Sequence, residues 1–513
     1  MMRAFLATAL VVQAAIAGPA RRDTAAGEIA RGIAALHDFE YEDANAAFRR
    51  ARELDADSVL ACWGEAMTFY QTLWRNENVD EGRAALVRLA ATPEARAAQA
   101  HTPKERLLLA AVERLFGDGT APARRAAYVD AMARAHEQMP EDADVTAFYA
   151  LALLGTMSRS LIGNGDAHDP ALAGSELQRR VGALLSHVLD AHPRHPGALH
   201  YLIHAYDDPA HARLALPAAR TFAEVAGESS HARHMPAHVF VQLGLWGEAE
   251  ASDRASWNVS EAWVRRRGFG PALRNYHALA WRQYELLQLG RYHEAAALLD
   301  DIAPSAAADP THRLQSDWSS MRARVAIEAR RWDLLAREDK FANVDDLFAI
   351  GISTARTGAL DRAEKVRQAL AQRATAAEEG DLRPAIAIME REMAAVIAFA
   401  SGRRADGLAI ADAAARAELD LPAPLGLPHP IKPATELFGE LLLEAGDPAR
   451  ARTAFDRTLQ RHANRSLAVL GLARAEMALK QTAAARADYG KLMENWKNAD
   501  DAPEVREARS GAR

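Results

Sequence analysis

The sequence predicts an all-α protein built from repeated pairs of antiparallel helices. Ala, Leu, Arg and Glu, which favour helices, are abundant throughout. Apolar residues recur at intervals of three and four, whereas the alternation typical of strands is almost absent. A chain of 513 residues is too long for one compact core, so we expect several domains or one elongated array of repeats.

Composition excludes several classes of protein. A content of 49% hydrophobic and 26% charged residues is typical of globular proteins and excludes wholesale disorder. The formal net charge of -7 argues against binding to nucleic acid, which usually requires a surplus of basic residues. Cys62 is the only cysteine, which excludes a disulfide framework and a cysteine-rich zinc module.

The first residues have the pattern of a secretory signal. Arg3 precedes an apolar stretch from Ala4 to Ile16, and Ala15-Ile16-Ala17 matches an A-x-A cleavage site. We therefore expect residues 1–17 to be removed and the mature chain to be periplasmic or secreted. No later segment reaches about 18 uninterrupted apolar residues, so we expect no membrane span after signal removal.

One arrangement of small and aromatic residues recurs along the chain. The same frame is occupied at the two ends by Gly32, Ala44, Phe48 and by Gly439, Ala451, Phe455. Its turn recurs as Gly244-Leu-Trp246-Gly-Glu-Ala249 and Gly290-Arg-Tyr292-His-Glu-Ala295. The glycine relieves the backbone where the first helix ends, and the alanine lets two helices approach closely.

This pattern resembles the tetratricopeptide repeat (TPR), a 34-residue helix-turn-helix unit, over most of residues 24–497. The alternative is an unrelated alanine-rich helical bundle. The resemblance implies a curved solenoid whose concave groove binds a protein, a peptide or a small-molecule ligand.

Breaks in the pattern divide the chain. We expect TPR-like helices in four blocks: residues 24–156, 176–303, 304–420 and 434–497, although the repeat frame of 75–195 is not set by the sequence. Residues 158–175, rich in Gly, Asp and Ser, predict a long loop. Residues 421–433 hold five prolines and predict an extended crossing segment, and 498–513 predict a flexible tail.

Histidines are concentrated in the central block. Nine of the eighteen lie between His187 and His238. His200 and His204 form one i, i+4 pair, and His234 and His238 form another, so each pair shares a helix face. Each member of the first pair precedes its counterpart by 34 residues, which is one TPR period. We therefore expect both pairs to stack on consecutive equivalent helices and to converge on one metal ion.

The repeat frame adds further candidates. The predicted metal-site residues are His200, His204, His231, His234, His238, His277 and Asp207. In TPR proteins these first-helix positions line the groove, and the same frame implies the following ligand-groove residues: Trp63, Met67, Tyr70, Tyr201, Tyr206 and Tyr284. For the aromatic residues, ordinary helix packing is the alternative.

Neutral imidazole suits zinc, copper or iron(II), so a transition metal is the expected cofactor. Three interpretations stay open: an exported binding protein with a metal or ligand in its groove, a metal-dependent enzyme, and a structural scaffold whose histidines only join helices by hydrogen bonds. The sequence lacks HExxH, GxSxG and GxxxxGK[ST], so it predicts no particular reaction.

Overall fold

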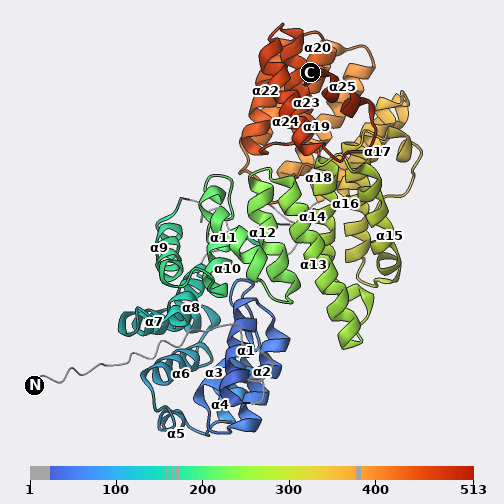
Figure 1. The fold of residues 1–513 in the computed structure, drawn as a ribbon. Coiled ribbons are helices and arrows are strands. Elements are labelled where there is room, and N and C mark those ends of the chain that lie inside the picture. The colour runs from blue at the N-terminus through green and yellow to red at the C-terminus, as the bar shows by residue number, and fades with distance from the viewer. Residues whose placement is uncertain (1–23, 157–159, 163–165, 169–173, 377–382) are drawn as a thin grey trace, which may run out of the picture. The chain divides into compact units, whose positions relative to one another are not determined.

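The computed structural model describes residues 24–156, 160–162, 166–168, 174–376 and 383–513. The predicted signal, residues 1–17, lies outside this part of the chain. By contacts the chain divides after Ala152 into two compact units. Both are almost entirely helical, as predicted (Figure 1). No described helix combines the length and apolar character that crossing a bilayer requires.

The first unit contains short helices and one small hairpin. Its elements are α1 (Ala25–His37), α2 (Tyr41–Leu54), α3 (Val59–Met67), β1 (Tyr70–Gln71), β2 (Asn76–Glu77), α4 (Val79–Val87), α5 (Pro93–Ala97), α6 (Pro103–Leu115), α7 (Ala121–Gln138) and α8 (Ala143–Leu154), the last of which ends just beyond the division. The Phe48 side chain of α2 packs against two glycines. A Cβ on Gly32 would lie 2.7 Å from its ring, and one on Gly64 would lie 2.2 Å away. Only glycine permits this approach.

The second unit begins with a small hairpin and continues as helices. Its first elements are β3 (Ser160–Ile162), β4 (Asp166–His168), α9 (Glu176–Ala191), α10 (Pro196–Ala205), α11 (Ala212–Val225), α12 (Ser230–Gln242), α13 (Trp246–Arg267), α14 (Tyr276–Gln288), α15 (Tyr292–Ala308) and α16 (Arg313–Glu328). The later ones are α17 (Val344–Arg356), α18 (Leu360–Ala376), α19 (Arg383–Ala400), α20 (Arg404–Leu419), α21 (Ala434–Glu444), α22 (Pro448–Arg461), α23 (Ser466–Ala478), α24 (Thr482–Asn495) and α25 (Pro503–Gly511). Consecutive helices pack against each other along the unit.

The repeat frame is confirmed at the predicted turns. Gly244 and Gly290 have φ of +67° and +69°, the left-handed conformation that ends a helix at glycine. Ala249 and Ala295, five residues further on, are fully buried between helices. Near the C-terminus, the Phe455 ring lies against Gly439 and Gly471 just as Phe48 lies against Gly32 and Gly64. The repeats are therefore helix–turn–helix units with a glycine at the turn and a close crossing of the two helices.

Two of the predicted breaks differ in the structure. The expected flexible tail contains α25, whose Val505 and Ala508 are buried against α24, because they form a small apolar face at helical spacing. The expected loop at 158–175 includes the β3–β4 hairpin, and its residues 158–159, 163–165 and 169–173 lie outside the described part. Residues 421–433 contain no helix, as their prolines predict.

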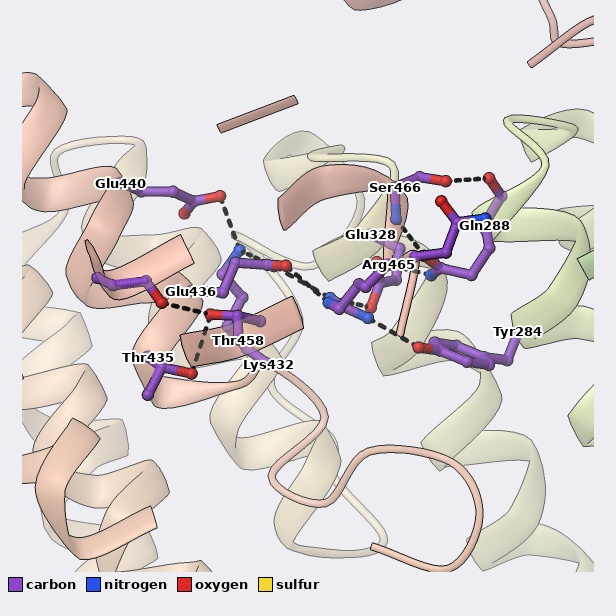
Figure 2. Close-up of polar contacts among 12 residues, drawn as sticks. Tyr284, Gln288, Glu328, Lys432, Thr435, Glu436, Glu440, Thr458, Arg465 and Ser466 are labelled. Carbon is purple, nitrogen blue, oxygen red and sulfur yellow. Dashed lines mark hydrogen bonds and ion pairs between the residues drawn. The ribbon is translucent and has the colours of Figure 1, made fainter. Parts of the chain in front are cut away.

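A buried cluster of charged groups joins distant parts of the second unit. Arg465, fully buried at the start of α23, donates to Glu436 of α21 at 2.7 Å, to Glu328 of α16 at 2.6 Å and to the Tyr284 hydroxyl of α14 at 3.1 Å (Figure 2). Lys432 adds a contact of 2.7 Å to Glu436. Burial opposes ionisation of Glu436, but Arg465 and Lys432 together hold its pKa below the ordinary value. The cluster thus fastens α21–α23 to α14 and α16.

Replacing Arg465 by Met removes the cation that contacts the buried Glu328 and leaves Glu436 with Lys432 alone. We expect Arg465→Met to destabilise the protein by about 3–5 kcal/mol, measured by urea unfolding, because breaking a buried ion pair from one side exposes the desolvation cost of the other. Arg506→Met, which removes only an exposed pair with Asp501, is the control and should cause no measurable change. Equal effects of the two substitutions would contradict this role for Arg465.

The buried carboxyl group of Glu392 in α19 should make the stability of the protein depend on pH. Its carboxyl group is fully buried, and neither oxygen has a hydrogen-bond partner among the described residues. Burial, and then the neighbouring Glu418, raise its pKa well above 4.5. The folded state therefore keeps a proton that the unfolded state releases, and stability falls as pH rises above about 4.5.

We expect Glu392→Gln to match the natural protein near pH 4, where both groups are neutral. It should become more stable than the natural protein as pH rises, by up to about 1.4 kcal/mol per pH unit until the folded-state pKa is passed. Melting curves between pH 4 and 9 measure this difference. A gap that stays constant with pH would show that Glu392 does not titrate in this way.

Candidate metal centre

Three helices carry the histidines, and a polar cap fixes where each begins. The side chains of His195, Ser229 and Asn275 accept hydrogen bonds from backbone N–H groups in the first turns of α10, α12 and α14. Counted from the first helical residue, the histidines of each i, i+4 pair occupy positions 5 and 9 of α10 and of α12. His231 and His277 occupy position 2 of α12 and of α14.

The first group of histidines consists of His234, His238 and His277. The Nε2 atom of His234 lies 3.0 Å from Nε2 of His238 and 3.0 Å from Nε2 of His277. All three nitrogens lie within 4.8 Å of one another. His234 and His238 are buried, and His277 is half-buried. Donors held 2.0–2.1 Å from one tetrahedral ion would lie about 3.3 Å apart, so this spacing suits a shared metal.

Two buried carboxylates orient the rings from behind. Nδ1–H of His238 donates to Asp207 at 2.7 Å, and Nδ1–H of His234 donates to Asp253. Both carboxylate side chains are almost completely buried. An ionised carboxylate only accepts hydrogen bonds, so each Nδ1 must carry the hydrogen. Each neutral ring then has its lone pair at Nε2, as metal-binding histidines do.

This arrangement is unfavourable without a cation. The Nε2 lone pairs of His234 and His238 face each other at 3.0 Å, and neither neutral ring has a hydrogen left to place between them. A metal ion or an added proton is required to turn this repulsion into attraction. The two buried negative charges of Asp207 and Asp253 match the charge of a divalent ion, which would make the buried centre neutral.

A further carboxyl group stands behind Asp253. Glu285 of α14 is fully buried beside Asp253. Burial raises the pKa of Glu285 to about 8, against a lowering contribution from Asp253. Glu285 is therefore protonated at neutral pH and adds no third negative charge to the centre.

Trp281 closes one side of the centre. Its ring centroid lies 4.5 Å from that of His238, 5.0 Å from that of His234 and 5.5 Å from that of His277. Gly426 of the proline-rich segment packs against the six-membered ring of the indole, where a Cβ would lie 2.6 Å from Cζ2. The segment is held by bonds from Gln242 to the Pro424 carbonyl and from Arg324 to the Pro428 carbonyl. The expected crossing segment thus lies over the histidine-bearing helices.

The second group consists of His200, His204 and His231. Nε2 of His200 lies 3.2 Å from Nε2 of His204 and 3.2 Å from Nε2 of His231. The expectation of one site shared by both i, i+4 pairs is therefore corrected to two separate groups. The reason is geometric. The histidine at position 2 of α12 reaches the pair on α10, and the histidine at position 2 of α14 reaches the pair on α12. The prediction of Asp207 as a ligand is also corrected, since its carboxylate holds Nδ1 of His238.

The predicted groove residues pack inside the protein. Trp63, Met67 and Tyr70 are buried in the first unit, where the Trp63 ring contacts Phe48 and Phe148 edge-on. In the second unit, Tyr201 is buried. Residues with large apolar surfaces at helical spacing are used here for packing rather than for lining an open groove.

Two other predicted groove residues have definite partners. The buried Tyr284 hydroxyl accepts from Arg465, and burial raises its pKa to about 12, against the lowering effect of Arg465. The Tyr206 hydroxyl lies over Gly182 of α9, 1.9 Å from where a Cβ would stand. Partial burial raises the pKa of Tyr206.

The sequence analysis did not identify Asp253 or Trp281. Asp253 is the 24th residue of its repeat, the position that Phe48 and Phe455 occupy in theirs. The available signal was a carboxylate at a position where two other repeats place a core phenylalanine. Trp281 lies four residues after His277 on α14 and so belongs to the same helix face.

Comparison with known proteins found similar solved structures but no related sequence. No family model matches the sequence, and no curated protein sequence matches it. Similar solved structures include a tetratricopeptide repeat protein from Parabacteroides merdae, with 17% identity, 56% of this chain and 99% of that chain covered, and a TM-score of 0.30. Yeast Tom70 shares 13% identity, with 95% of each chain covered and a TM-score of 0.28.

The carboxylates behind the rings predict a selective effect of substitution. Asp207→Asn should weaken zinc binding by about 10–100-fold, because the amide lacks the negative charge that makes His238 a stronger donor. Asp208→Asn is the matched control, since the carboxylate of Asp208 is hydrogen-bonded to His211 and Gln178. Isothermal titration of the tag-free protein with zinc measures both. Equal losses in the two variants would contradict the role given to Asp207.

Proposed function

We propose that this chain is an exported helical-repeat protein that binds a transition metal ion through Nε2 of His234, His238 and His277. Export rests on the signal pattern of residues 1–17. Metal binding rests on one observation: two buried carboxylates fix the hydrogens of His234 and His238 on Nδ1, so that their Nε2 lone pairs converge.

The donor set narrows the choice of metal. Three imidazole nitrogens suit zinc, copper or iron(II) better than calcium or magnesium, which prefer oxygen ligands. Asp207 and Asp253 favour a divalent ion because their two buried charges are then neutralised. Among these ions, zinc is the simplest probe, since it does not change oxidation state.

A layer of hydrogen-bonded histidines explains the geometry less well. Such a layer needs one hydrogen between each pair of nitrogens. His234 faces two Nε2 atoms at 3.0 Å, and its own hydrogen is used by Asp253. A single ion satisfies all three nitrogens at once.

A metal-dependent enzyme is the second candidate. Three protein ligands, rather than four, are typical of catalytic zinc sites, where water or substrate takes the remaining position. The repeat architecture is also of the kind that binds protein or peptide partners, and such a partner could then meet the protein near its metal centre.

Elemental analysis of full-length protein purified without a histidine tag tests metal binding. We expect stoichiometric transition metal, and a melting temperature that rises when zinc is added to metal-free protein, because an ion that binds only the folded state stabilises it. His277→Ala, which removes a half-buried ligand, should lose one equivalent of metal. His187→Ala, an exposed histidine outside both groups, is the control. Metal-free protein that melts at the same temperature with and without zinc would overturn the proposal.

A further inference from the structure

We infer that His200, His204 and His231 form a second transition-metal centre, a copy of the first displaced by one repeat along the chain. This inference rests on the proposed function, since both centres use the same donor chemistry. It extends that function from one metal ion to two.

The geometry of the second group supports a shared ion. Its three ligand nitrogens lie within 4.8 Å of one another, with His200 in the middle at 3.2 Å from each neighbour. His200 is fully buried, whereas His204 and His231 are half-buried. The ring of Phe222 stacks on His200 with centroids 5.1 Å apart, which fixes the ring and keeps water from its face.

The two groups repeat the same design. In each, positions 5 and 9 of one first helix supply two nitrogens, and position 2 of the next first helix supplies the third. Helix α12 takes part in both, giving His231 to the second centre and His234 with His238 to the first. Three positions that recur in two consecutive repeats, each with Nε2 directed inward, indicate a repeated ligand set rather than scattered histidines.

Hydrogen bonding alone does not account for the central nitrogen. Nε2 of a neutral imidazole carries either one hydrogen or one lone pair. With one hydrogen, His200 can donate to only one of the two nitrogens that it faces; with one lone pair, it must accept twice along a single direction. A cation at the centre meets three lone pairs without this conflict.

The two centres differ in the residue at the position that Asp253 occupies in its repeat. Asp253 is residue 24 of its repeat, and the same position of the preceding repeat is the buried Ala219. Ala219 cannot supply the carboxylate that Asp253 gives to His234. We therefore expect the second centre to bind a divalent ion more weakly and to fill after the first.

The number of zinc ions bound by metal-free, tag-free full-length protein tests this inference. Isothermal titration with zinc chloride, checked by elemental analysis after dialysis, should give two ions for the natural protein. His231→Ala and His277→Ala remove position-2 ligands of the second and first centres, and each should bind one ion. The double variant should bind none, and His187→Ala should still bind two.

The outcomes separate the two proposals. One ion in the natural protein, lost in His277→Ala and kept in His231→Ala, would overturn the second centre and leave the proposed function standing. No bound ion would overturn both. Two ions retained in His231→Ala would also overturn the inference. Circular dichroism establishes that each variant is folded, and His204→Ala provides an independent test through another half-buried ligand.

Discussion

The hydrogen bonds from His238 to Asp207 and from His234 to Asp253 are the constraint on which the centre depends. They determine where each ring keeps its hydrogen, and therefore which nitrogen is a donor of electrons. They also bury two negative charges at the junction of α10, α12 and α13. Such charges are costly in a protein interior unless a cation or a set of hydrogen bonds compensates them. In the proposed centre, the same two contacts define the ligand nitrogens and supply the negative charge that an ion would neutralise.

The repeat architecture explains how this constraint arises. Stacking of equivalent helices brings residues separated by one repeat to neighbouring places, so that position 2 of α14 meets positions 5 and 9 of α12. The second helix of the pair, α13, presents Asp253 where α2 and α22 present Phe48 and Phe455. A position that is apolar in those repeats is therefore occupied by a carboxylate that orients His234. The buried Arg465 cluster holds α14 against the later helices and keeps Tyr284, on the same helix as His277, in place.

Much of the fold could be predicted from the sequence because it depends on local patterns. Glycine turns, small residues at helix crossings and the 34-residue interval all act within one or two helices, and the structure confirms them at Gly244, Ala249 and Phe48. The sequence predicts a flexible tail, whereas the structure contains α25 there. The apolar face of α25 has only two buried residues, Val505 and Ala508. Two residues are too few to recognise as a periodic pattern.

The candidate site could be predicted only in part. The spacing of the histidines matches the repeat and predicts that they lie together, and the structure brings them together in two groups. Their division into two groups depends on the side-chain reach between neighbouring helices, which spacing along the chain does not specify. Asp207 is predicted as a metal ligand because carboxylates bind metals, whereas in the structure it accepts a hydrogen bond from Nδ1 of His238. The aromatic residues Trp63 and Tyr284 were ambiguous for the same reason, since groove-lining and buried aromatics follow the same helical spacing.

X-ray absorption spectroscopy at the zinc edge, on tag-free protein loaded with zinc, tests the central claim most directly. The account predicts about three imidazole nitrogens per zinc at 2.0–2.1 Å, with no sulfur ligand. A first shell made mainly of oxygen, with one imidazole or none, would contradict it.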